Sequence, residues 1–222
     1  MSSPQALLRP IRNSLLSLGV AISVVAPASL SALLITSSSD PALGGALVET
    51  FDGYAPAYFA SQAFLIGTDG FSVTALASDL HIDNTYCGSF GTSGSCLDTL
   101  ASGGGANDDF DVVFTGPGVA AFGFDLTALD GDWTVETYDA SNNLLSTYVI
   151  LSQSPGLTGF NRRGYFGATE ALPIQHFTVR AAGNDRALID NLAYRPIPEP
   201  SIAILAGLGL LGLAIIGPKS RL

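Results

Sequence analysis

Carboxylates are the side chains of this sequence with the most evident capacity for binding metal ions. Glu49 and Asp52 stand at the start of the central region, in the segment 49–53 (ETFDG), and Asp190 stands near its end. If the first and last strands of the region lie side by side, these three carboxylates approach one another. Ca²⁺ requires several oxygen ligands of this kind, so the three residues are candidate ligands of a structural calcium ion. The alternative is a turn at Asp52 and an ordinary strand end at Asp190.

Groups suited to catalysis are scarce. The chain has two histidines, His81 and His176, and no Gly-x-Ser-x-Gly sequence, the nucleophile motif of many hydrolases. A glycosidase needs one pair of carboxylates as acid and base, and no motif distinguishes such a pair here. We therefore expect a protein without enzymatic activity. The alternative function is a secreted hydrolase of polysaccharides that uses paired carboxylates.

The two cysteines of the chain, Cys87 and Cys96, lie in a loop rich in glycine and serine, with eight residues between them. An even number of cysteines at short range is typical of a disulfide in an exported protein. Closing a loop of this size stabilises the fold by about 2–3 kcal/mol on entropic grounds. We predict a disulfide between Cys87 and Cys96.

The charge of the central region, residues 47–195, argues against one class of partner. The region contains 17 Asp and Glu residues against five Arg and no Lys, for a net charge of −12. A surface of this charge repels the phosphate backbone of nucleic acids, so no nucleic-acid binding is expected. The length of the region suits one ordinary domain with a real core.

Alternating hydrophobicity predicts that this domain is built from strands. Runs rich in β-branched and aromatic residues repeat with a period of two, and clusters of Gly, Pro, Asn and Asp separate them. A hairpin loop is expected at residues 139–143. About seven to ten short strands in one domain predict an all-β fold, an antiparallel β-sandwich of jelly-roll kind. The clearest expected strands cover residues 71–76, 110–115, 119–127, 133–139, 144–151, 174–180 and 187–194.

Aromatic residues offer a second kind of binding chemistry, because their rings stack on the apolar faces of sugars. Tyr54, Tyr58 and Phe59 lie in a segment without clear alternation, and Tyr165 and Phe166 follow a loop rich in glycine and arginine. Phe and Tyr are also common in the interior of sandwiches. Each of these residues is therefore a candidate for sugar stacking or for the core.

The N-terminal 46 residues have the layout of an export signal. Arg9 and Arg12 precede an apolar run, poor in charge, that extends to Ile35, and small residues accompany it. Cleavage is expected near residue 28, after an Ala-Pro-Ala sequence, or near residue 46. The alternative is an uncleaved anchor, since the run is about long enough to cross a bilayer.

A second apolar segment, residues 201–217, lies near the C-terminus and carries no charge. It has the shortest length at which a helix spans a membrane. Lys219 and Arg221 follow it, and positive charge holds that end on the cytoplasmic side. We predict a transmembrane helix, with the preceding domain on the outer side.

The end of the chain resembles a known sorting signal. Pro198-Glu199-Pro200 stands directly before the apolar segment, and the basic residues follow it. Over residues 196–222 this order of parts resembles the PEP-CTERM sorting domain of Gram-negative bacteria that make extracellular polysaccharide. The resemblance implies export, passage through the inner membrane by way of the C-terminal helix, and recognition by an exosortase-type enzyme that cuts near the Pro-Glu-Pro motif. The protein is then expected at the cell surface or in the exopolysaccharide matrix.

The two ends of the central region resemble a further group of proteins. The opening segment 49–53 and the closing segment 189–194, with its Ile-Asp-Asn sequence and an aromatic residue, resemble carbohydrate-binding jelly rolls that hold a structural calcium ion. This resemblance implies extracellular polysaccharide as a partner and calcium as a cofactor. The sequence as a whole predicts an exported, non-enzymatic surface protein with glycan as its ligand.

Overall fold

The computed structural model describes residues 32–92, 94–102, 109–129, 131–151, 164–183 and 185–198. In these residues nearly all regular structure is β strand, with two short 3-10 helices, η1 (Pro41–Leu43) and η2 (Cys87–Phe90). No helix in these ranges is long and apolar enough to cross a membrane. The expected signal up to residue 31 and the expected span 201–217 lie outside the described residues, as do Glu199, Pro200, Lys219 and Arg221.

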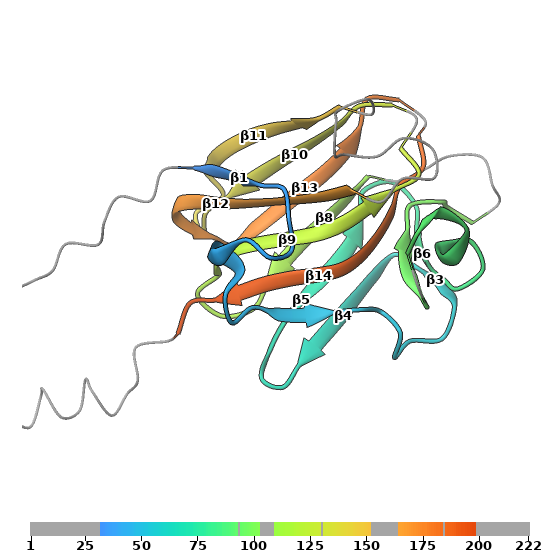
Figure 1. Ribbon diagram of the computed structural model, residues 1–222, viewed down its shortest axis with the longest axis horizontal. Helices are drawn as coiled ribbons and strands as arrows, with labels where there is room; N and C mark the ends of the chain where they lie inside the picture. The colour runs from blue at the N-terminus through green and yellow to red at the C-terminus, as the bar shows by residue number, and fades with distance from the viewer. Residues whose placement is uncertain are drawn as a thin grey trace, which may run out of the picture.

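The described residues form two antiparallel sheets that lie face to face (Figure 1). Sheet A has the order β1-β12-β9-β14-β7-β6-β3, and β2 also pairs with β14. Its strands are β1 (Leu33–Ile35), β2 (Leu47–Glu49), β3 (Ala57–Phe59), β6 (Leu80–Asp83), β7 (Cys96–Asp98), β9 (Val119–Thr127), β12 (Gly164–Ile174) and β14 (Leu188–Pro196). Sheet B has the order β11-β10-β13-β8-β5-β4. Its strands are β4 (Ser61–Ile66), β5 (Asp69–Ala75), β8 (Phe110–Phe114), β10 (Trp133–Tyr138), β11 (Leu144–Ile150) and β13 (His176–Ala181).

An aromatic core fills the space between the two sheets. In β10 every second residue is buried, and these residues point toward sheet A. Phe122 of sheet A stacks on Phe177 of sheet B with 4.1 Å between the ring centroids. Each fully buried side chain of this size contributes about 1.5–3 kcal/mol relative to an exposed one. The structure thus confirms the predicted all-β antiparallel sandwich.

The hairpin between β10 and β11 shows the expected turn chemistry. Oδ1 of Asp139 accepts hydrogen bonds from the backbone N–H groups of Ser141 and Asn143, each at 2.8 Å. Asn142 adopts a φ of 63°, a left-handed conformation that asparagine tolerates better than most residues. The predicted loop at 139–143 is therefore confirmed.

The domain begins earlier than the expected boundary at residue 47, which is therefore wrong. Residues 33–46, here called the N-terminal arm, lie against sheet A (Figure 1). Strand β1 pairs with β12, so that Leu34 faces Ala168. Ile35 and Leu43 of the arm are buried against the outer face of the sheet. The apolar character of this segment thus serves the fold.

The N-terminal arm favours one of the two expected cleavage sites. Cleavage near residue 46 would remove Ile35 and Leu43, whereas cleavage near residue 28 leaves the arm whole. We expect N-terminal sequencing of the exported protein to give a first residue near 29. We also expect a chain that starts at residue 47 to be less stable by about 3–6 kcal/mol in urea unfolding, because two buried side chains are lost. An exported protein that begins at residue 47 would contradict the first expectation, and equal stability of the two chains in urea would contradict the second.

Candidate functional site

The predicted calcium ligands Glu49 and Asp52 serve as acceptors for backbone groups. Oε1 of Glu49 accepts from the N–H of Phe51 at 2.7 Å, and burial raises the pKa of Glu49. Oδ1 of Asp52 accepts from the N–H of Ser95 at 2.8 Å. A Cβ on Gly94 would collide with the Asp52 carboxylate, so the glycine permits this close approach. Asp52 therefore ties the start of the domain to the loop that carries the cysteines.

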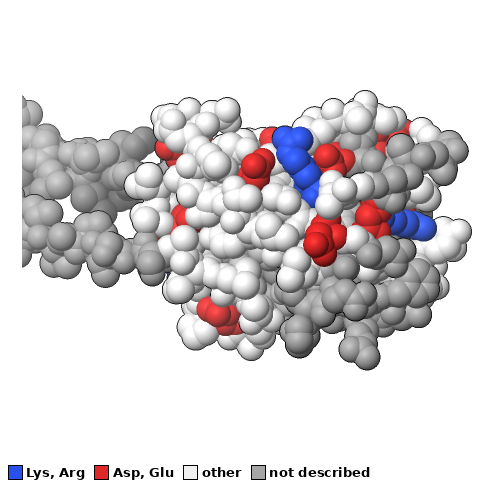
Figure 2. Space-filling view, turned by 90° about the horizontal axis from the view of Figure 1, so that it is seen from above, with Lys and Arg blue, Asp and Glu red and all other residues white. Residues whose placement is uncertain are grey.

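The third predicted ligand, Asp190, lies on β14 and is buried. Its Oδ1 accepts from the N–H of Asn191 at 2.7 Å, and its register partner is Asp125 of β9. Among the described residues no group of three or more His, Cys, Asp or Glu side chains could hold a metal ion. Glu49, Asp52 and Asp190 are thus not brought together as one ligand set, and calcium stays a prediction from the sequence. Figure 2 shows acidic side chains spread over the visible face, with basic ones beside some of them.

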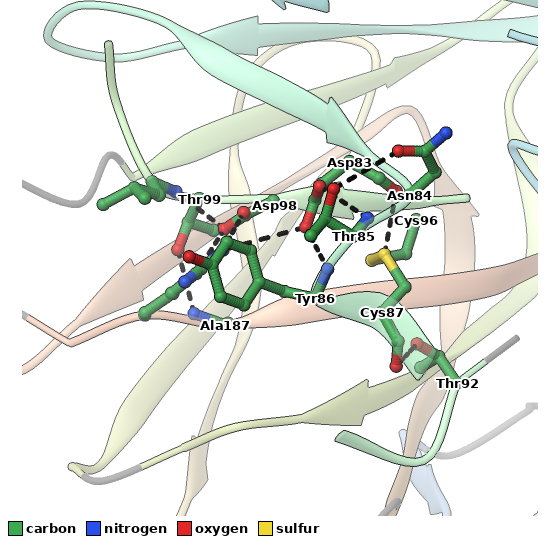
Figure 3. A network of polar contacts seen from close by, with 12 residues as sticks. Asp83, Asn84, Thr85, Tyr86, Cys87, Thr92, Cys96, Asp98, Thr99 and Ala187 are labelled. Atoms are coloured by element: carbon green, nitrogen blue, oxygen red, sulfur yellow. Dashed lines mark hydrogen bonds and ion pairs between the residues drawn. A yellow bond between two sulfur atoms is a disulfide. The ribbon is translucent and has the colours of Figure 1, made fainter. Parts of the chain in front are cut away.

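The predicted disulfide is confirmed. Cys87 and Cys96 are joined, with 5.9 Å between their Cα atoms. Both residues are buried, and they pack with Leu188 of β14 on the outer face of sheet A. The hydroxyl of Thr92 donates to the carbonyl oxygen of Cys87 at 2.6 Å inside the loop (Figure 3).

The candidate aromatic residues divide between core and surface. Phe166 belongs to the core between the sheets, and Tyr54 and Phe59 pack against that core. Tyr58 is exposed and stacks on His81. Tyr165 is buried on the outer face of sheet A, away from the main core.

A pocket of about 380 Å³ lies between the N-terminal arm and the outer face of sheet A. Three neighbouring strands supply Asp125 (β9), Tyr165 (β12) and Asn191 (β14). The N-terminal arm and β2 supply most of the other lining residues, of which Ser38 is polar. The described residues that line this pocket are Ser38, Leu43, Gly45, Ala46, Val48, Asp125, Tyr165, Asn191 and Ala193.

A strand irregularity places Asn191 in the pocket. The register between β14 and β9 shifts between Asp190 and Ala193, and such bulges redirect side chains. Asn191 has a φ of 50°, which asparagine tolerates better than other non-glycine residues. Its Nδ2 donates to Oδ2 of Asp125 at 2.8 Å. The two side chains therefore hold each other in a fixed arrangement at the pocket wall.

Among the described residues, the hydroxyl group of Tyr165 has no hydrogen-bond partner. The residue is 6% exposed, and its ring lies over Gly123, where a Cβ would come within 2.6 Å of the phenolic oxygen. Burial raises the pKa of Tyr165, and the charges of Asp125 and Asp40 raise it further. The phenol is therefore neutral at physiological pH and able both to donate and to accept. Buried hydroxyl groups are nearly always bonded, so this unpartnered one makes the pocket the candidate functional site.

The first residue of the expected sorting motif, Pro198, lines a second pocket, of about 530 Å³, with Asp69 and Thr115 among its other lining residues. The N–H of Ile197 donates to the carbonyl oxygen of Gly118 at 3.2 Å. The folded domain therefore extends to the residue directly before the motif.

Comparison with known proteins gives no family for this chain. No family model matches it, and no curated protein matches it. Among solved structures, the module TmCBM61 in complex with beta-1,4-galactotriose has 13% sequence identity and a TM-score of 0.38, covering 57% of this chain and 88% of its own. The K2 cleaved adhesin domain of Lys-gingipain has 11% identity and a TM-score of 0.39, covering 69% and 99%. A family 29 carbohydrate-binding module has 11% identity and a TM-score of 0.32, covering 77% and 99%. Likeness at this level assigns neither a family nor a ligand to this chain.

Proposed function

We propose that this protein is an exported, non-enzymatic β-sandwich protein of jelly-roll kind that binds glycan at the cell surface or in the exopolysaccharide matrix. The observation that carries the proposal is the pocket lined by Asp125, Tyr165 and Asn191, beside which the enclosed hydroxyl of Tyr165 has no hydrogen-bond partner among the described residues. Burying such a group costs stability. The hydroxyl oxygen is enclosed, so a ligand would reach it only after a small movement of the Tyr165 side chain, and a hydrogen bond to it would then offset that cost.

The composition of the pocket supports a sugar as that ligand. Sugar hydroxyl groups both donate and accept, and the pocket presents a carboxylate, an amide and a phenol. Sugars also carry apolar C–H faces, and Leu43 and Val48 provide apolar surface in the same pocket. A concave site with both apolar surface and a few polar groups is typical of small-ligand sites.

The same pocket supports binding over hydrolysis. Asp125 is the one acidic residue among its described lining residues, whereas glycoside hydrolysis requires two carboxylates on either side of the bond. The cellular setting in the proposal comes from the Pro198-Glu199-Pro200 motif and the apolar segment after it, with an exosortase-type enzyme as the processing partner. Because the fold extends to Ile197, that enzyme would act immediately beside the folded domain.

Tyr165→Phe tests the pocket by removing one oxygen atom. We expect about tenfold weaker binding of polysaccharide purified from cells that export the protein, measured by calorimetry, because one hydrogen bond to the ligand is lost. The thermal stability of the variant should be equal to or higher than that of the parent chain, because the unpartnered hydroxyl is removed. A purely structural role for the hydroxyl predicts lower stability instead.

Tyr194→Phe is the matched control. Tyr194 is also a buried tyrosine whose hydroxyl has no partner among the residues that the structure describes, but its ring packs in the core against Phe71 and Phe114. Removing the hydroxyl group of Tyr194 should change stability as Tyr165→Phe does and should leave binding of the polysaccharide unchanged. The proposed function would be refuted if Tyr165→Phe and Tyr194→Phe bound the polysaccharide with the same affinity. It would also be refuted if the parent chain did not bind the polysaccharide.

A further inference from the structure

Tyr58 lies on the outer face of sheet A with one ring face held and the other open. The residue is 47% exposed, on the short strand β3. Its ring stacks on that of His81 on β6, with 4.2 Å between the centroids and an interplanar angle of 12°. Because His81 covers one face and nearly half of the residue is exposed, the opposite face is open to solvent.

Tyr86 is held in a similar way, close to the disulfide. It is 48% exposed, and the guanidinium carbon of Arg186 lies 4.3 Å from the centre of its ring. Nε and Nη2 of Arg186 both donate to the carboxylate of Asp98. The backbone N–H of Tyr86 donates to Oδ2 of Asp83 at 2.8 Å (Figure 3). The ring is therefore fixed from the side chain and from the backbone.

Tyr58 shares a sheet face with the pocket. Tyr58, His81 and Asp98 are successive register partners across β3, β6 and β7. Their neighbours in sequence, such as Ile82, point into the core, as Phe166 does beside Tyr165. Tyr58 and Tyr165 are therefore on the same outer face, five strand spacings apart. At 4.7–4.9 Å a spacing, this corresponds to about 24 Å along the sheet.

We infer that Tyr58 and Tyr86 form a second glycan subsite, here called the tyrosine platform, and that the ligand is an extended sugar chain. The inference rests on the proposed glycan binding in the pocket. Exposed aromatic rings stack on the apolar faces of sugars, and rings already fixed by His81 and Arg186 lose little conformational entropy on binding. A chain long enough to reach both subsites gains affinity through its second contact, whereas a short fragment occupies one at a time.

The length of the sugar chain is the variable that tests this inference. The polysaccharide purified from cells that export the protein is hydrolysed and sized into one- or two-sugar fragments and fragments longer than about 24 Å. We expect the long fragments to bind the parent chain about tenfold more tightly than the short ones. Tyr58→Ala should reduce the affinity for long fragments to the level of the short ones and leave short-fragment binding in the pocket unchanged. Tyr86→Ala should act in the same direction.

Tyr138→Ala is the matched control, because Tyr138 stacks on His176 in the same manner on sheet B, with 4.4 Å between the centroids. Thermal melting establishes that each variant is folded, and Tyr138→Ala should bind both fragment classes as the parent does. Equal affinity for long and short fragments, or a long-fragment advantage that survives Tyr58→Ala, overturns the inference while the pocket stands. Binding of neither class by the parent chain refutes the proposed function as well.

Discussion

Replacing Arg186 with methionine should lower the free energy of unfolding by about 3–5 kcal/mol, because it leaves a buried charge without its partner. Asp98 is 0% exposed, and its carboxylate accepts from Nε of Arg186 at 2.8 Å and from Nη2. Asp83, also buried, lies 3.9 Å from the same guanidinium group. Burial alone would lower the pKa of Arg186, but its hydrogen bonds to Asp98 together with the nearby charges, chiefly those of Asp98 and Asp83, raise it. Urea unfolding measures this loss, and the slope of the free energy of unfolding against urea concentration should not change.

Arg180→Met provides the comparison, because it removes the same type of side chain from an exposed ion pair. Arg180 is 49% exposed at the side chain and lies 3.7 Å from Glu136. Exposed pairs contribute little, so the loss should stay within about 0.5 kcal/mol. Adding Asp98→Asn to Arg186→Met should recover part of the stability, since the uncompensated charge is then removed. A loss no larger for Arg186→Met than for Arg180→Met would contradict the argument.

The position of this ion pair makes it relevant to function as well as to stability. Arg186 joins β7 to the segment before the disulfide, where Tyr86 and Cys87 follow Asp83 (Figure 3). Sγ of Cys87 lies 2.8 Å from the carbonyl oxygen of Asp83. The charged network and the disulfide therefore hold the same loop, which carries half of the tyrosine platform.

The sequence pattern predicted those strands that have one face buried in the core and the other face more exposed. In β8 and β10 buried residues alternate with more exposed ones, which is the period-two pattern that alternation detects. The hairpin at 139–143 was predictable because Asp139 and Asn142 have side chains suited to a tight turn. The disulfide was predictable because short spacing left one pairing for Cys87 and Cys96.

Strands covered on both faces could not be recognised by the same pattern. In β12 the first seven residues are all buried, because the core covers one face and the N-terminal arm covers the other. The alternation therefore disappears, and the residues that cause this, Ile35 and Leu43, belong to a segment that looked like part of an export signal. Strands of three or four residues, such as β3 and β7, are too short to show a period and depend on their partners.

The candidate site was only partly visible in the sequence. Tyr165 was one of several aromatic candidates, and nothing local distinguished it from Phe166, which faces the core. Asn191 carried an unused signal, because asparagine is rare inside strands and tolerates the left-handed backbone of a bulge. Asp125 carried another, as a single acid within the apolar strand β9. Their meeting in one pocket depends on strand order, which the sequence pattern does not reveal.

Glu170→Ala should lower the free energy of unfolding by about 3 kcal/mol or more, because three hydroxyl groups lose their acceptor. Glu170 of β12 is 5% exposed. Its Oε1 accepts from the hydroxyl groups of Thr137 at 2.6 Å and Tyr148 at 2.9 Å, and its Oε2 accepts from Ser146 at 2.9 Å. These donors lie on β10 and β11, so one carboxylate joins sheet A to sheet B. Urea unfolding at neutral pH measures the loss.

Glu170→Gln separates the hydrogen bonds from the charge. Its amide oxygen can accept from Thr137 and Tyr148, and its amide nitrogen can donate to Ser146, so the loss should be about 1 kcal/mol. Burial raises the pKa of Tyr148 from the ordinary 10.0 to about 12, and its hydrogen bond to Glu170 contributes to this rise. A tyrosine whose pKa is raised in the folded state contributes stability that is fully present below pH 10. That contribution is lost as the pH rises toward 12. The parent chain should therefore lose stability in that window, and Glu170→Ala should lose less. Equal pH dependence in the two chains, or a Glu170→Gln loss as large as that of Glu170→Ala, would contradict this role for the carboxylate.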